Sequence, residues 1–354
     1  FVKQILVDRY GEEMVENGGL KVTTTLDLDL QQEAEKIVAE EIEKVVNLNI
    51  TNGAVIVLEP ESGEILAMVG SRDYNEPNFG KVNVVTQGLR QPGSAIKPVT
   101  YVTALKKGYT AAHLLLDTRT EFPGASKEKP YIPVNYDGKY HGPVLMRYAL
   151  GNSLNVPAVK MLAQVGLENM LETAYQMGFT TLKPTAENLS KFGLAVTLGG
   201  GEVRLIEMAG AYAAFANGGL KVEPTAILKV ENQEGKVLEE AKPAKGKQVL
   251  TQGEAFIISD ILADNNARLI SFGANSLLNI PGRQVAVKTG TTNNMKDNWA
   301  IGWTPQALVG VWVGNNDNSS MKQVASGISG ASPIWRRVIM AALKDKPNVN
   351  FTPP

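Results

Sequence analysis

Apolar residues recur at helical spacing near the start of the chain. They fall three and four positions apart over residues 30–45, which predicts an amphipathic helix with Asp27 or Asp29 as its N-terminal cap. A short helix and then a strand over residues 20–25 are expected before it. We assign residues 1–52 to an N-terminal linker segment, whose amphipathic helix must pack on the rest of the protein.

A different pattern, of β-rich runs around turn residues, begins at residue 53. Two apolar runs over residues 54–58 and 65–69 flank a turn that contains proline and glycine, which predicts a β-hairpin. Three more strands, separated by short turns, are typical of an antiparallel sheet; they are predicted over residues 284–288, 299–303 and 308–313. A terminal helix over residues 333–343 is expected to cover this sheet.

Between these β-rich parts the pattern becomes helical. Apolar segments broken by glycines over residues 144–218 predict an all-helical subdomain. A second hairpin is expected over residues 226–239 and another helix over residues 254–262. The polar region 117–142 is expected to be irregular and to line a cleft.

These elements predict an α+β fold, in which an antiparallel β-sheet is covered by helices and joined to the all-helical subdomain. The length of 354 residues suits one large domain with smaller segments attached. We assign residues 53–346 to the main domain and residues 347–354 to a C-terminal tail.

The amino-acid composition excludes several kinds of catalytic group. The chain has no cysteine and only two histidines, which excludes thiol nucleophiles and disulfides and leaves few candidates for a Ser-His-Asp arrangement. Its net charge of -1 gives no support to nucleic-acid binding. No stretch is long and apolar enough to cross a bilayer, so we expect any membrane anchor to lie upstream in a parent protein. Base chemistry therefore falls to lysine or a carboxylate.

The stretch 90–98 places an alcohol and an amine three positions apart at a predicted helix start. Pro92 and Gly93 are turn residues, and a mostly apolar helical run follows. Residues three apart share a helix face, so Ser94 and Lys97 can project into one cleft. A serine is a weak nucleophile unless a base takes its proton, and a desolvated lysine can be that base.

This S-x-x-K pattern is a weak signal when it stands alone. Ser126 with Lys129 and Ser319 with Lys322 also match it, in polar, loop-like stretches that offer no shared helix face. A surface serine near a lysine is the ordinary interpretation of such a match. Further motifs are needed to identify Ser94, and not Ser126 or Ser319, as the candidate nucleophile.

Two rarer motifs each occur once and follow Ser94 in order. Ser153-Leu154-Asn155 is the one S-x-N of the chain, and Lys288-Thr289-Gly290 is the one K-T-G and closes an apolar strand. With this set the sequence resembles the penicillin-binding proteins and serine β-lactamases. Leu154 stands where the S-D-N form of the middle motif has an aspartate.

The resemblance is closest to the transpeptidase domain of class A penicillin-binding proteins. It rests on residues 88–97, 136–140, 151–159, 198–203, 287–292 and 297–299, preceded by the linker-like stretch 18–27. It implies that Ser94 attacks the carbonyl of a terminal D-Ala-D-Ala peptide and forms an acyl-enzyme. It also implies that an amine of a neighbouring peptidoglycan stem peptide is the acceptor, that β-lactams are covalent inhibitors, and that no cofactor or metal is needed.

The resemblance gives a role to each motif residue. Lys97 is expected to be the general base, and Ser153 to pass a proton toward the leaving amine. Lys288 is expected to attract the substrate carboxylate and, as a like charge, to disfavour protonation of Lys97. The backbone N–H groups of Ser94 and Thr291 are expected to form the oxyanion hole. The expected substrate-binding residues are Asn155, Thr289, Gly290 and Thr291.

Two other functions remain open at this point. Water in place of the acceptor amine would make the protein a D,D-carboxypeptidase or a β-lactamase, and the motifs do not decide between water and amine. A protein that is acylated without turnover would be a β-lactam sensor. The resemblance also implies an extracytoplasmic location and a membrane-anchored parent with a glycosyltransferase domain.

Overall fold

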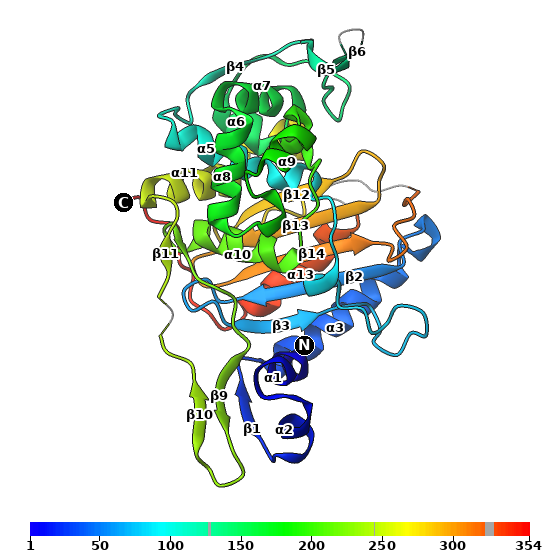
Figure 1. The fold of residues 1–354 in the computed structure, drawn as a ribbon. Coiled ribbons are helices and arrows are strands. Elements are labelled where there is room, and N and C mark those ends of the chain that lie inside the picture. Colours follow the sequence, from blue (N-terminus) through cyan, green and yellow to red (C-terminus); the bar gives the residue numbers. More distant parts are fainter. Residues whose placement is uncertain (127–128, 244, 323–328) are drawn as a thin grey trace.

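The chain folds around a five-stranded antiparallel sheet (Figure 1). In this computed structural model, which describes residues 1–126, 129–243, 245–322 and 329–354, the strand order is β12-β13-β14-β2-β3. The strands are β2 (Asn52–Leu58), β3 (Ile65–Val69), β12 (Ala286–Thr291), β13 (Asp297–Trp303) and β14 (Leu308–Gly314). The predicted sheet is confirmed, and β12, which carries the K-T-G motif, is one of its edges.

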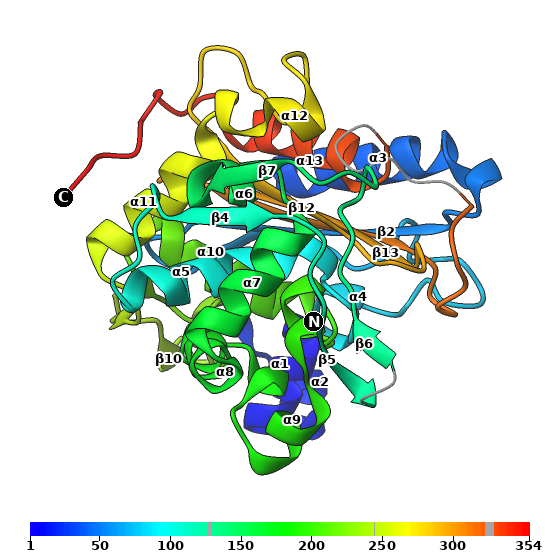
Figure 2. The same cartoon turned by 90° about the horizontal axis from the view of Figure 1, so that it is seen from above.

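Helices cover both faces of this sheet (Figure 2). Along each strand, side chains alternate between two cores, as the two-residue repeat of a strand requires: Ile56 and Ile301 lie in one, Val57 and Val311 in the other. The first core lies under α10 (Leu205–Ala216) and α11 (Gln252–Ala263), and the second under α3 (Leu28–Glu43) and α13 (Ala331–Ala342). The predicted helices 30–45, 254–262 and 333–343 are therefore confirmed, with Asp27 as the cap of α3.

The predicted helical subdomain, 144–218, shares the first core with the sheet. It contains α6 (Met146–Gly151), α7 (Asn155–Val165), α8 (Leu167–Met177) and α9 (Ala186–Lys191), whereas α10, at the end of the predicted range, covers the sheet itself. Helix α5 (Lys97–Lys106) packs against α7, α8 and α11, and its residues 97–105 are all buried. The motif lysine at the start of α5 is therefore enclosed by other helices.

The N-terminal part pairs with a distant hairpin. Helices α1 (Val2–Tyr10) and α2 (Glu12–Asn17) precede β1 (Lys21–Thr24), which pairs with β9 (Ile227–Glu231), and β9 pairs with β10 (Val237–Glu240). The predicted strand and hairpin are confirmed, but the single helix expected first is split in two at Gly11, whose φ is 82°. The proposed division of the chain at residue 52 stays a prediction.

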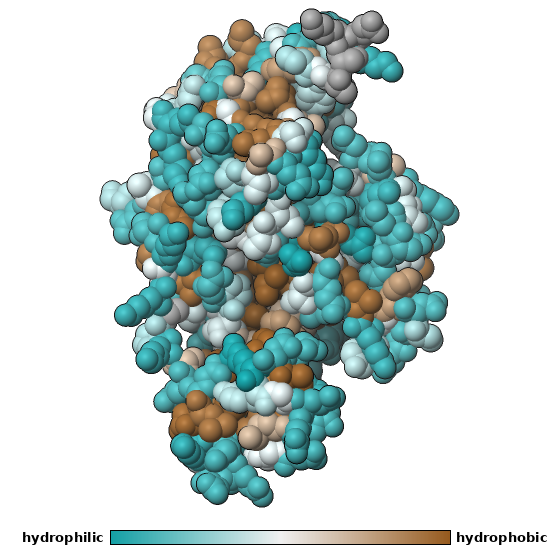
Figure 3. All heavy atoms as spheres, viewed as in Figure 1, coloured by the Kyte–Doolittle hydropathy of each residue, from teal (hydrophilic) through white to brown (hydrophobic). Residues whose placement is uncertain are grey.

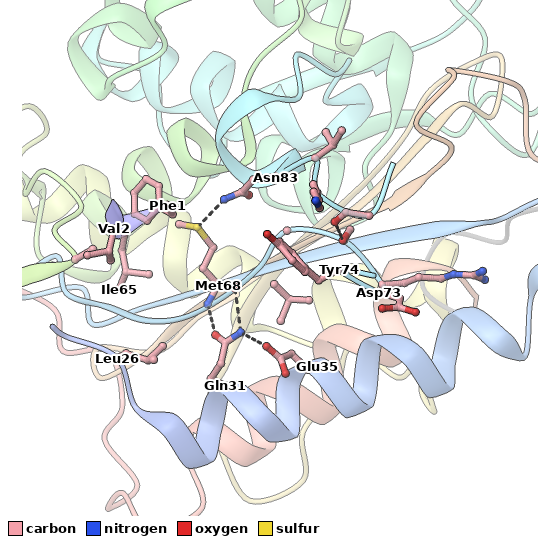
Figure 4. Close-up of a pocket in the computed structure, with 18 of the residues that line it drawn as sticks. Phe1, Val2, Leu26, Gln31, Glu35, Ile65, Met68, Asp73, Tyr74 and Asn83 are labelled. Atoms are coloured by element: carbon pink, nitrogen blue, oxygen red, sulfur yellow. Dashed lines mark hydrogen bonds between the residues drawn. The ribbon is translucent and has the colours of Figure 1, made fainter. Parts of the chain in front are cut away.

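Strand β3 forms the other edge of the central sheet, and side chains from α3 cover it. The Gln31 amide donates to Met68 O and accepts from Met68 N–H, at 3.1 and 2.7 Å, as a neighbouring strand would (Figure 4). Asp27 N–H donates to Leu66 O at 2.9 Å, and Val84 N–H to Gly70 O at 3.0 Å. The outward-facing backbone groups of β3 are thus engaged, which blocks edge-to-edge pairing.

The region 117–142 was expected to be irregular, and this holds for residues 118–121 and 132–141 but is wrong for the short strands between and beside them. Strand β4 (Leu114–Asp117) pairs with β7 (Gly142–Leu145), and β5 (Phe122–Ser126) pairs with β6 (Lys129–Tyr131). Proline and glycine in these short two-stranded ribbons interrupt the alternation that predicts strands. Residues 132–141 are irregular, as expected.

Besides several 3-10 turns, the short elements include α4 (Val84–Gln87), α12 (Leu269–Phe272) and the pair β8 (Leu220–Lys221) with β11 (Lys247–Gln248). On the face drawn in Figure 3, hydrophilic residues predominate and separate several apolar patches. Among the described residues, no helix has the length and hydrophobicity needed to cross a membrane.

Candidate active site

Ser94 lies in a single 3-10 turn, Gly93–Ile96, directly ahead of α5. The α-helix itself begins three residues later than expected, at Lys97, and Pro98 occupies its first turn, where a missing N–H is tolerated. In a 3-10 turn, side chains at positions i and i+3 eclipse one another. The turn therefore places Ser94 and Lys97 on one side, as the S-x-x-K spacing predicts.

Two glycines let this turn press against the edge strand. Gly93 has a φ of 53°, a left-handed conformation that side chains disfavour. A Cβ on Gly290 would lie 2.2 Å from Pro92 O, so a larger residue cannot stand in the middle of the K-T-G motif without displacing the turn. The indole N–H of Trp299 also holds the turn, donating to Gln91 O at 2.8 Å.

The Lys97 amine is fully buried and hydrogen-bonded to the S-x-N motif. Its Nζ donates to Ser153 O at 2.5 Å and to Asn155 Oδ1 at 2.7 Å, and lies 3.4 Å from Ser153 Oγ. Burial, and after it the charge of Lys288, holds the pKa of Lys97 well below its usual range. A neutral amine has two N–H groups and one lone pair. The two acceptors use the N–H groups and leave the lone pair free to accept a proton.

Ser153 connects the two motif lysines. Its backbone is in the left-handed region, with a φ of 57°, in the turn between α6 and α7. Its carbonyl oxygen accepts from Lys97, while its hydroxyl oxygen accepts from Lys288 Nζ at 2.7 Å. One strained residue thus presents two different groups to two buried amines.

Lys288 is 2% exposed and makes a second hydrogen bond, to Thr289 O at 2.8 Å. Burial, and after it the charge of Arg268, lowers its pKa to about 7. Arg268 is itself 3% exposed, and burial lowers its pKa to about 10. Arg268, together with Lys288 when it is protonated, therefore places positive charge in this part of the protein, which favours an anionic ligand there.

The S-x-N motif is held in place from the region 132–141. The Asn135 amide oxygen accepts from the backbone N–H groups of Asn155 and Val156, at 2.8 and 3.2 Å. The Asn155 amide nitrogen donates to Val134 O at 2.7 Å. The Asn155 side chain is therefore fixed with its oxygen toward Lys97.

A cavity of about 180 Å³ opens onto Ser94. Among the predicted site residues, Ser94, Ser153, Asn155, Thr289 and Thr291 line it, whereas Lys97, Lys288 and Gly290 lie behind its wall. Among the described residues, the Ser94 hydroxyl makes no hydrogen bond to Lys97 or to any other group. Catalytic hydrogen bonds commonly tighten only when substrate is bound.

Comparison with known proteins shows the family to which the chain belongs. Residues 53–339, most of the chain, match the family described as the penicillin binding protein transpeptidase domain. The chain belongs to this family. Its relatives are class A penicillin-binding proteins, as the resemblance implied, so the chain is a transpeptidase domain of that class.

Two curated relatives show how much of such a protein the chain represents. Penicillin-binding protein 2D of Bacillus subtilis is 35% identical over 351 residues, which cover 97% of this chain and 48% of that protein. Penicillin-binding protein 1A of Aquifex aeolicus is 36% identical over 302 residues, covering 85% of this chain and 39% of that protein. The chain thus spans about half or less of the length of these relatives.

Solved structures share the fold. PonA1 of Mycobacterium tuberculosis in complex with penicillin V is 26% identical, with a TM-score of 0.83 over 99% of this chain and 93% of that chain. Penicillin-binding protein 1A of Haemophilus influenzae is 24% identical, with a TM-score of 0.87 over 100% of this chain and 71% of that chain. The predicted α+β fold, with its antiparallel sheet and helical subdomain, is confirmed by these likenesses.

Three residues around the candidate site were missed by sequence reasoning. Asn135 lies in the polar stretch that was expected to line a cleft, so composition hinted at it. Asn152 and Arg268 gave no signal, because an isolated asparagine or arginine is ordinarily a surface residue. Both are 3% exposed. Further residues that line the cavity are Tyr136, Asp137, Leu154, Leu198, Ile270, Ser271, Phe272 and Asn293.

The other S-x-x-K matches lie apart from the candidate site at Ser94. Lys322 Nζ donates to Asn47 O at 3.4 Å, away from Ser319. Ser126 pairs with Lys129 across the β5–β6 ribbon, and the Ser126 side chain is outside the described residues. Neither serine lines the cavity at Ser94.

A larger hollow, of about 810 Å³, lies at the opposite edge of the sheet between the N-terminal segment, α3 and β3 (Figure 4). It contains none of the predicted site residues. Its size alone does not make it the active site, because the motif residues and the lysines of lowered pKa surround the smaller cavity.

Proposed function

We propose that this transpeptidase domain is a serine D,D-transpeptidase that cross-links peptidoglycan stem peptides through an acyl-enzyme at Ser94 and is inhibited by β-lactams. The observation that carries the proposal is the fully buried Lys97, bonded to Ser153 and Asn155, three residues from a cavity-lining serine. An amine that is neutral at working pH can take the serine proton.

Acylation begins when Ser94 Oγ bonds to the carbonyl carbon of the D-Ala-D-Ala peptide bond and its proton passes to Lys97 Nζ. The C–N bond then breaks, and the departing D-Ala amine takes a proton through Ser153. The ester that remains is attacked by the amine of a second stem peptide, which loses a proton and releases Ser94. A β-lactam enters the same path, but its amine stays attached after ring opening, so the adduct keeps the full mass of the drug.

The substrate carboxylate is expected to bind beside β12. The Thr289 and Thr291 side chains line the cavity, with the Lys288 charge behind them. Asn298 Nδ2 donates to Thr291 Oγ1 at 2.9 Å, which orients that hydroxyl. The N–H groups of Ser94 and Thr291 remain our proposal for the oxyanion hole, in which one donor is typically worth about a hundredfold in rate or more.

Hydrolysis is the main competing outcome. The one carboxylate that lines the cavity is Asp137, which accepts from Lys139 N–H at 3.0 Å and lies 3.1 Å from His141 Nε2. The exposed residues Glu168, Glu172 and Glu187, considered as deacylating bases from the sequence, do not line it. No described carboxylate is therefore placed by its hydrogen bonds to activate water beside Ser94.

Labelling with a fluorescent penicillin, followed by peptide mapping, tests the nucleophile. We expect one adduct on Ser94, none in Ser94→Ala, and almost none in Lys97→Ala. Circular dichroism is the control that both variants are folded. An adduct on Ser126 or Ser319 would overturn the assignment.

Incubation with a stem pentapeptide and an acceptor amine separates the three functions. A cross-linked dimer supports transpeptidation, a trimmed peptide alone shows a carboxypeptidase, and a stable penicillin adduct without peptide turnover shows a sensor. We further propose that the parent protein is membrane-anchored, acts outside the cytoplasm and carries a glycosyltransferase domain, in keeping with the longer relatives.

A further inference from the structure

Asn152, directly before Ser153, ties two separate parts of the chain together. It is 3% exposed, and its Nδ2 donates to Tyr148 O at 3.0 Å and to Ala267 O at 2.9 Å. Its Oδ1 accepts from Ser271 N–H at 3.0 Å, and its backbone oxygen accepts from Ser271 Oγ at 2.8 Å. Three of these four hydrogen bonds connect the α6–α7 turn to residues 267–271, and the bond to Tyr148 O stays within α6 and its turn.

The residue next to this tie holds an unfavourable conformation. Ser153 has a φ of 57°, and the left-handed region costs a residue with a Cβ. Local bonds alone, Ser153 N–H to Leu150 O and Leu154 N–H to Ala149 O, each at 3.0 Å, close the turn on the α6 side only. The Asn152 tie holds it on the other side, so Ser153 is fixed from both directions.

The strained conformation is what lets Ser153 face both lysines. Its carbonyl accepts from Lys97 at 2.5 Å and its hydroxyl from Lys288 at 2.7 Å. If the turn relaxed, the backbone rotation that moves the carbonyl would also move the hydroxyl. Both contacts therefore depend on the same backbone angle.

The far end of the tie also belongs to the site. Residues 267–271 include Arg268, whose positive charge helps to lower the pKa of Lys288. They also include Ile270 and Ser271, which line the cavity. Gly151 packs against the same segment, where a Cβ would lie 2.4 Å from Ala267 O. The tie thus sets the distance between the Ser153 turn and this wall of the cavity.

We propose that Asn152 is a positioning residue for acylation: through its bonds to Ala267 and Ser271 it holds Ser153 in the conformation that serves Lys97 and Lys288. This inference rests on the proposed function at Ser94. Displacement of a catalytic group by about 1 Å can cost up to roughly a hundredfold in rate. We expect the acylation rate constant of Asn152→Ala to fall about tenfold to hundredfold.

Asn315 gives a matched control. It is 2% exposed and makes four side-chain hydrogen bonds, to Thr51 N–H and Oγ1 at 3.0 and 2.7 Å, and to Asn49 O and Ser319 O at 2.9 and 3.0 Å. It lines a separate hollow of about 130 Å³. Asn315→Ala thus removes four side-chain hydrogen bonds, against three in Asn152→Ala, without touching the Ser153 turn.

The experiment measures acylation by a chromogenic β-lactam in stopped flow, with rates normalised to the fraction of protein that titrates. We expect Asn152→Ala to lose acylation rate while the dissociation constant of the non-covalent complex changes less than about threefold, and Asn315→Ala to keep the wild-type rate constant. Ser271→Ala, which removes one bond of the tie, should lose about threefold and replaces Asn152→Ala if that variant does not fold.

A wild-type rate constant in the titratable fraction of Asn152→Ala would overturn the positioning role, as would a loss confined to the dissociation constant. An equal loss in Asn315→Ala would overturn it too, by showing a general effect of destabilisation. Failure of wild-type protein to form an adduct on Ser94 would instead overturn the proposed function, so the two failures are distinct.

Discussion

Burial of Lys288 should make the protein less stable at neutral pH than the same fold without that charge. Its pKa falls from 10.5 to about 7 in the folded state. Between these values the unfolded chain binds more protons than the folded one, so stability rises with pH, by about 1.4 kcal/mol per pH unit for one group. At pH 7 the resulting penalty is roughly 4 kcal/mol.

Lys288→Met removes this penalty and also two hydrogen bonds. The bonds from Nζ to Ser153 Oγ and Thr289 O are 2.7 and 2.8 Å long, and losing each costs about 1 kcal/mol. Because the protonation penalty is larger than the bond loss, we expect the variant to be about 2 kcal/mol more stable than wild type at pH 7.

Urea unfolding at pH 7, 8, 9 and 10 tests this directly. Between pH 7 and pH 10 the free energy of unfolding of wild type should rise, relative to that of Lys288→Met, by roughly 3 kcal/mol. Lys107→Met, at an exposed position, controls for loss of a positive charge in general and should follow wild type. Parallel pH dependences for wild type and Lys288→Met would refute the reasoning, since they would show that Lys288 titrates alike in the folded and unfolded states.

Three further predictions concern the same strand. Removing the like charge in Lys288→Met should raise the pKa of Lys97, so the fall in acylation rate at acidic pH should begin at a higher pH than in wild type. An unchanged pH dependence would contradict the charge interaction between Lys288 and Lys97. Substitution of Lys288 should weaken ligands with a free carboxylate far more than their amides, measured by competition with labelled penicillin, and equal losses would exclude it as the anchor. Gly290→Ala, whose Cβ would meet Pro92 O at 2.2 Å, should lose labelling by at least about tenfold; wild-type labelling would show that the turn can yield.

The strands and most helices were predictable because their hydrophobic periodicity is local. The pairing of β1 with β9 was not, since a short polar strand carries no mark of a partner some 200 positions away. The 3-10 turn at Ser94 was also missed, because Pro92 and Pro98 mark only the limits of a helix start and not its hydrogen-bond pattern.

The motif residues could be found from the sequence because their types and order are rare together. Their surroundings could not. The left-handed backbone of Ser153 arises from contacts with distant segments, and Arg268 affects Lys288 only through the folded packing. Burial, which decides the charge of both motif lysines, is likewise a property of the whole fold.

The account depends most on the charge state of Lys97, and NMR of 15N-lysine-labelled protein measures it directly. Nζ resonances are followed from pH 6 to pH 11, and the Lys97 signal is identified by its absence in Lys97→Met. We predict that this amine titrates well below the 10.5 of an ordinary lysine, so that it is neutral when Ser94 is acylated. Titration of Lys97 near 10.5 would contradict its role as the base.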